Sequence, residues 1–172
     1  MALRKMLGSA DHPAIRHMMR LMETQSHRTL TRFALDAAAR YLPIVQERVP
    51  GETRLTAALE AVLAHLDGAP LAPVKAAVKD ARAAAQALAG DPVAQAAARA
   101  VATACATAAT PTCALGFTFY GAAAIAYHTA GVDADRSIHD DLATRELERL
   151  CTALEAACIP NEPDPVRVVW GC

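Results

Sequence analysis

The chain has 172 residues, a length that suits one domain and leaves little room for a second independent core. Alanine, the strongest intrinsic helix former, occurs 42 times, whereas aromatic residues make up 4%, and this composition predicts a helical fold. The 17 basic and 18 acidic residues give a formal net charge of −1, which argues against nucleic acid or an anionic membrane surface as a partner.

The N-terminal segment predicts a first helix. Asp11 is a candidate N-cap, with Pro13 in the first turn, for a helix that reaches about Thr24. Residues 1–13 lack the apolar run of a secretory signal, so we expect the protein to stay in the cytoplasm.

A second helix is predicted after Ser26, its candidate N-cap. Apolar residues recur there every three or four positions and mark one buried face: Leu30, Phe33, Ala37, Tyr41 and Val45. Pro43 falls inside this pattern, where it removes a backbone hydrogen bond and clashes with the preceding turn. We therefore expect a kink or a break near Leu42.

Three more helices are predicted over residues 52–67, 73–89 and 91–109, because glycines end the first two and the apolar positions follow a helical period. Asp91 and Pro92 form a strong start signal for the third of them, a cap followed by proline at the first helical position.

Residues 100–132 contain no Asp, Glu, Lys or Arg. Small and weakly apolar side chains dominate this stretch and Pro111 interrupts it, so a membrane span is a poor interpretation. Thr110 and Pro111 repeat the cap-then-proline signal, which predicts a helix that reaches His128 and ends at Gly131. We expect a buried helical hairpin at the centre of the fold.

The last predicted helix covers residues 135–158, and a split near Asp141 is left open. Three prolines follow, so residues 160–172 should form an extended C-terminal tail behind a helical domain of residues 1–159. About seven helices result. Because the successive hairpins share little sequence, we predict an all-α, single-domain helical bundle with Ala-rich central hairpins, in preference to a helical repeat protein.

The residues offer no recognisable catalytic or metal-binding motif. The five cysteines form an odd set without CxxC pairs or histidines at ligand spacing: Cys105, Cys113, Cys151, Cys158 and Cys172. We interpret them as reduced thiols that mostly pack within helices. No zinc hydrolase signature, nucleophile elbow or phosphate-binding loop is present, so the sequence predicts no cofactor or metal and favours a protein that is not an enzyme.

Aromatic residues near the end of the charge-free helix form one candidate site. Tyr120, Tyr127 and His128 could line an apolar pocket of a helical enzyme or a small-ligand carrier, with His128 the histidine expected to be buried. The simpler interpretation is that Gly116 and Gly121 admit a close helix crossing while the rings fill the core.

Acidic residues form a second candidate site. Four aspartates surround the start of the last helix: Asp133, Asp135, Asp140 and Asp141. The helix dipole stabilises carboxylates at that end, and the same carboxylates could also steer a basic protein partner. Trp170, the one tryptophan, either anchors an interface or folds back over a groove between helices.

The central pattern resembles a known family. It consists of FALDAAARYLPIVQERVPGETRLTAALEAVLAHLDG, then AAVKDARAAAQAL, then AAARAVATACATA and CALGFTFYGAAAIAYHTAG, within roughly residues 28–131. This order of features is similar to an all-helical, Ala-rich bacterial family of putative immunity proteins, associated with toxin systems used in competition between bacteria. By that resemblance Arg40, Pro43, Arg54 and Glu60 match positions of the family's first helical hairpin and serve its structure.

The resemblance implies a non-enzymatic protein that neutralises a cognate toxin by direct binding. Asp135, Asp140, Asp141 and Trp170 are the candidate partner-binding residues. The pocket described above is the alternative, and a homodimer joined through Ala-rich faces is a third hypothesis.

Overall fold

The computed structural model describes residues 3–171 and contains eight α-helices in that range. In chain order they are α1 (Pro13–Met22), α2 (His27–Ala38), α3 (Leu42–Arg48), α4 (Arg54–Leu66), α5 (Ala72–Ala87), α6 (Pro92–Ala106), α7 (Cys113–Ala130) and α8 (Arg136–Ala157). Residues 3–171 form no strand, although an isolated β-bridge joins Ser26 to Pro165. The predicted all-α fold is confirmed.

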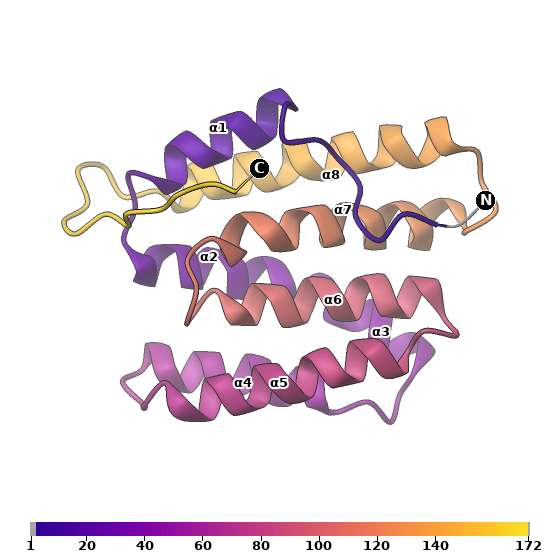
Figure 1. Cartoon of the computed structure of the whole chain (residues 1–172), viewed down its shortest axis with the longest axis horizontal. Coiled ribbons are helices and arrows are strands. Elements are labelled where there is room, and N and C mark those ends of the chain that lie inside the picture. The colour runs from indigo at the N-terminus through magenta and orange to yellow at the C-terminus, as the bar shows by residue number, and fades with distance from the viewer. Residues whose placement is uncertain (1–2, 172) are drawn as a thin grey trace.

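Helices α6 and α7 occupy the middle of the bundle (Figure 1). Helix α6 packs against α2, α3, α4, α5 and α7, and 11 of its 15 residues are buried. On one side of the central pair lie α8 and α1, and on the other lie α4 and α5. The charge-free stretch therefore forms the end of α6 and all of α7, as the prediction of a buried hairpin required.

The break predicted near Leu42 is confirmed, and it raises the number of helices from about seven to eight. Helix α2 ends at Ala38, and α3 begins at Leu42 with Pro43 in its first turn. Between them the fully buried Tyr41 packs onto Gly121 of α7, where an added Cβ would overlap the Tyr41 hydroxyl and ring. A glycine is needed at this crossing because the two elements approach so closely.

The start predicted for α7 at Thr110 and Pro111 is wrong. The amides of Cys113 and Ala114 donate to the Thr110 and Pro111 carbonyls, three positions back, so residues 110–112 form a tight turn between α6 and α7. The helix itself begins at Cys113. Proline occurs in turns as well as at the first position of a helix, so the Thr110–Pro111 pair does not distinguish the two.

The cap predicted for α1 is also displaced by one residue. His12, and not Asp11, directly precedes the helix, and its Nδ1 accepts a hydrogen bond from the Ala14 amide at 3.1 Å. Asp11 pairs instead with Arg16 at 2.5 Å on the surface.

Helix α8 has 22 residues and runs unbroken past Asp141. At ~1.5 Å per residue it is about 33 Å long, so its two ends serve different surfaces of the molecule. Within residues 3–171, none of the helices combines the length and the apolarity that a bilayer crossing requires.

Candidate functional site

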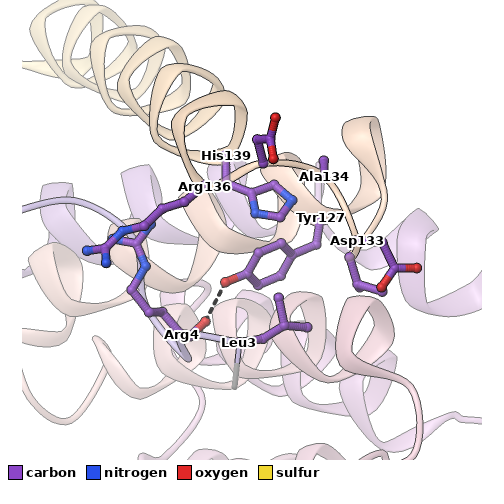
Figure 2. Close-up of a pocket in the computed structure, with 9 residues that line it drawn as sticks. Leu3, Arg4, Tyr127, Asp133, Ala134, Arg136 and His139 are labelled. Carbon is purple, nitrogen blue, oxygen red and sulfur yellow. Dashed lines mark hydrogen bonds between the residues drawn. The ribbon is translucent and has the colours of Figure 1, made fainter. Parts of the chain in front are cut away.

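A cavity of about 460 Å³ opens where α7 turns into α8 (Figure 2). The N-terminal segment, the end of α7, the α7–α8 loop and the first turn of α8 provide its walls: Leu3, Arg4, Tyr127, Val132, Asp133, Ala134, Asp135, Arg136 and His139. The fully buried Leu7 fixes the N-terminal segment, because its amide donates to the Phe119 carbonyl of α7 at 3.1 Å.

Tyr127 and His139 pack together in this cavity. Their ring centroids lie 4.8 Å apart at an interplanar angle of 82°, an edge-to-face contact. The Tyr127 hydroxyl donates to the Arg4 carbonyl at 2.7 Å, and His139 Nε2 donates to the Gly131 carbonyl at 2.8 Å. Burial raises the pKa of Tyr127, with Arg4 acting in the opposite direction, so the hydroxyl stays a donor. Both polar side chains are therefore occupied with backbone acceptors.

The charged side chains around the cavity do not converge on it. Arg4 forms an ion pair with Asp140, and Arg136 Nε lies 3.7 Å from the second oxygen of the same carboxylate. Figure 2 shows the side chains of Arg136 and Asp133 pointing in opposite directions, away from the Tyr127 ring. Arg4 and Arg136 are therefore engaged with Asp140, and His139 with the Gly131 carbonyl, an arrangement that suits the fixing of the loop between α7 and α8.

Three carboxylates near this cavity remain free of ion pairs among the residues that the structure describes, namely Asp133, Asp135 and Asp141. All three residues are exposed, and we call them the acidic corner. Residues 133–141 contain four aspartates and one arginine, a local charge of −3 compared with −1 for the whole chain. Of the predicted partner-binding set, Asp135 and Asp141 are thus available to a partner, whereas Asp140 is engaged with Arg4 and Arg136.

Trp170, the fourth residue of that set, lies at a different place. Its indole Nε1 donates to Glu23 Oε1 at 2.7 Å, and Glu23 lines a hollow together with Glu155 and Cys158 at the C-terminal end of α8. The acidic corner is at the N-terminal end of the same helix. Most of the length of α8 therefore separates Trp170 from the aspartates, and the four predicted residues form two surfaces.

The C-terminal tail folds back onto the start of α2. Glu162 accepts hydrogen bonds from the Ser26 amide at 2.7 Å, the Ser26 hydroxyl at 2.8 Å and the Thr29 hydroxyl at 2.5 Å. Burial works to raise the pKa of Glu162, but the bonds from Thr29 and Ser26 together lower it. The dipole of α2 also stabilises a carboxylate at its N-terminus, so the charge of Glu162 helps to hold the tail against the bundle.

The structure separates the residues of the predicted aromatic pocket. Only Tyr127 lines the cavity, while Tyr120 is half-buried two turns earlier in α7. The expectation that His128 is buried is wrong, because a one-residue step along a helix turns the side chain by about 100° and carries it from the buried side to solvent. His139, which is 5% exposed, is the buried histidine.

A buried carboxylate in α8 escaped the sequence analysis. The side chain of Glu146 is 2% exposed, accepts a hydrogen bond from the Tyr41 hydroxyl at 2.7 Å, and is held by two bonds from Arg149 at 2.7 and 2.8 Å. Burial and then the Glu146 charge raise the pKa of Tyr41 well above its usual range. The network joins the α2–α3 break to α8, and its polar atoms satisfy one another, so it is structural.

Comparison with known proteins gives one match. The family model of the Imm-5 like putative immunity protein matches residues 20–156, which include α2 through nearly all of α8 and most of the cavity, but exclude residues 3–19 and the tail. No curated protein and no solved structure matches the chain significantly. A match over 137 of 172 residues is far more than half of the chain, and the protein therefore belongs to the Imm-5 like putative immunity protein family.

Proposed function

We propose that this protein neutralises a bacterial toxin by binding it directly through the acidic corner at the start of α8. Membership of an immunity protein family supports a protein partner. The observation that carries the choice of surface is the concentration of unpaired carboxylates at one end of a rigid helical bundle.

An exposed apolar residue lies within the acidic corner. Ile138 is 45% exposed in the first turn of α8, three residues after the N-cap Asp135 and three before Asp141, so it lies between the two carboxylates. Protein interfaces commonly place an apolar anchor at the centre and charged residues at the rim. The matching toxin surface is an apolar depression surrounded by lysine or arginine side chains.

Binding alone can account for immunity, because a one-to-one complex that covers a toxin's working surface needs no chemical step. The negative field of the acidic corner accelerates encounter with a basic partner, an effect that reaches about tenfold or more at low ionic strength. The Ile138 side chain then limits dissociation, because truncation of a central apolar anchor commonly costs over ~1 kcal/mol.

The proposal is tested with the toxin encoded beside the gene of this protein. Growth rescue on co-expression and association kinetics with the purified toxin are measured for the wild type, for D135N/D141N and for I138A. D67N/D80N is the matched control, because Asp67 and Asp80 are exposed, make no ion pair among the described residues, and lose the same charge.

We expect D135N/D141N to slow association about tenfold at low salt and less at high salt, where the field is screened. The control should stay within about twofold of the wild type. A toxin that binds both double variants equally well contradicts the acidic corner as the binding surface. A neighbouring toxin that neither binds nor loses toxicity contradicts the immunity function itself.

A further inference from the structure

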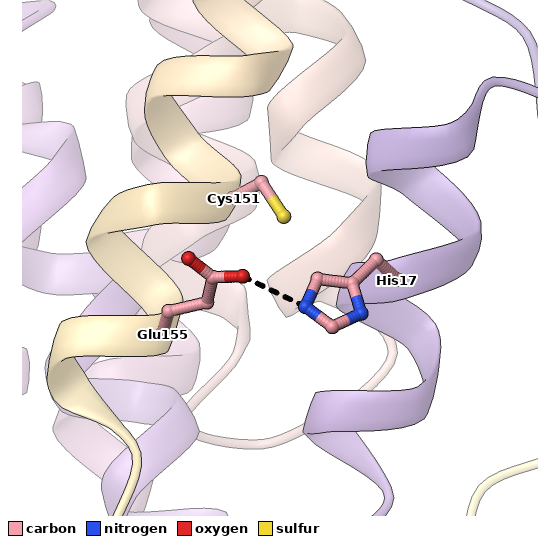
Figure 3. A group of neighbouring side chains, drawn as sticks. All are labelled: His17, Cys151 and Glu155. Atoms are coloured by element: carbon pink, nitrogen blue, oxygen red, sulfur yellow. Dashed lines mark hydrogen bonds and ion pairs between the residues drawn. The ribbon is translucent and has the colours of Figure 1, made fainter.

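Three side chains with metal-binding atoms meet between α1 and α8, at a distance from the acidic corner (Figure 3). His17 comes from α1, and Cys151 and Glu155 come from α8. The atoms that could bind a metal all lie within 4.8 Å of one another. His17 Nε2 lies 2.8 Å from Glu155 Oε1, and Figure 3 shows the Cys151 sulfur facing the space between them.

Local structure explains why these residues face each other. Cys151 and Glu155 are four residues apart in an unbroken helix, so they lie one above the other on the same face. Helix α1 packs against that face and presents His17. Cys151 is 8% exposed at the edge of the core, whereas the side chains of His17 and Glu155 are 40% and 49% exposed. The cluster is thus closed on one side by the core and open to water on the other.

We propose that His17, Cys151 and Glu155 form a binding site for one Zn²⁺ ion, with water as the fourth ligand. Imidazole nitrogen, thiolate sulfur and carboxylate oxygen are the three ligand types that zinc takes in proteins, and three protein ligands plus water is a usual tetrahedral set. Zinc bonds of ~2.0–2.3 Å place ligand atoms roughly 3.3–3.8 Å apart, so shifts of about 1 Å bring the three atoms into position.

The cost of that rearrangement is small. The His17–Glu155 contact that opens is half-exposed, and such surface pairs contribute little to stability. Zinc binds the thiolate form of Cys151, so binding releases the thiol proton to water.

The site is a feature of this chain beyond the family match, because His17 lies outside residues 20–156. A bound zinc ion would link the first helix to the last and would stabilise the folded state by mass action. It makes no use of the acidic corner, so the two proposals stand or fall separately.

Cobalt(II), which takes the place of zinc and reports a thiolate ligand by a charge-transfer absorption band, provides the test. The reduced, metal-free full chain is titrated with Co²⁺ and then with Zn²⁺ as competitor. We expect one equivalent of Co²⁺ to bind with the thiolate band, and Zn²⁺ to displace it and raise the melting temperature.

Variants locate the site. C151S and H17Q should lose the band, and E155Q, a change at a half-exposed position that leaves the core intact, should weaken zinc binding about tenfold or more. C158S and H128Q are matched controls, because among the residues that the structure describes neither belongs to the cluster, and they should bind as the wild type does. Absence of saturable binding by the wild type, or a thiolate band that persists in C151S, overturns the proposal.

Discussion

Two glycines of α7 provide a sharp test of how the centre of this protein is packed. Helix propensity alone predicts that G116A and G121A each stabilise the protein by about 1 kcal/mol. At Gly116 an added Cβ would contact only the Thr103 methyl group, at 3.6 Å, which is ordinary van der Waals contact. At Gly121 it would overlap the hydroxyl and the ring of Tyr41.

The two substitutions should therefore have opposite signs. Tyr41 is 0% exposed and its hydroxyl is bonded to the buried Glu146 carboxylate, so the ring cannot withdraw without losing that bond. A hydrogen bond to a charged group contributes about 1.5–3 kcal/mol, and overpacking costs about 1–3 kcal/mol. After the propensity gain of about 1 kcal/mol is subtracted, we expect G121A to destabilise by about 1.5–5 kcal/mol and G116A to stabilise by about 0.5–1 kcal/mol.

Urea unfolding followed by far-ultraviolet circular dichroism measures both values from the midpoint and slope of the transition. Equal stabilisation by the two alanines would refute the close contact between Tyr41 and α7. Equal destabilisation would show that α7 tolerates no added methyl group along its length, which contradicts the ordinary contact at Gly116.

Two further predictions concern buried and capping carboxylates. Y41F keeps the ring but removes the hydroxyl donor to Glu146, so it should lower the free energy of unfolding by about 1.5–3 kcal/mol. The control E148Q, on the exposed face of α8, should change that free energy by less than about 0.5 kcal/mol. Equal effects of the two variants in urea unfolding would rule out the buried network. Because the pKa of Glu162 is lowered in the folded state, its contribution to the free energy of unfolding is complete above the unfolded pKa of about 4.5 and is lost as the pH falls through the folded pKa. Acid should therefore release the tail, and Trp170 fluorescence should report an acid transition that is absent in E162Q. An unchanged transition in E162Q would count against this role of Glu162.

The fold could be predicted because its signals are local. Helical periodicity and the proline and glycine boundaries act within a few residues, which is why the helical segments, the break before Pro43 and the buried central pair agree with the sequence. The start of α7 was misplaced by a few residues, because a cap-then-proline signal and a proline turn have the same residue pattern.

The site was harder to predict because its contacts join distant parts of the chain. Helix α7 is apolar on all sides, so periodicity does not say which way His128 points, and the sequence analysis placed it on the wrong side. His139 is buried because the α7–α8 loop carries it back onto Tyr127. His17 and Cys151 are 134 residues apart, and no ligand spacing along the chain relates them. The acidic residues were found because they are close in sequence.

The two proposed sites lie on different parts of α8 and are independent of each other. Its buried face supports the bundle through Leu147, Leu150 and Leu154, so recognition falls to what its two ends expose. Asp135 and Cys151 are 16 residues apart, about 24 Å along the helix axis, which is some three times the ~8 Å screening length at physiological ionic strength. A zinc ion at Cys151 therefore adds no appreciable charge at the acidic corner. Because the charge-free helix α7 packs against α8, each surface can change without disturbing the other, which suits the proposed recognition of one particular toxin.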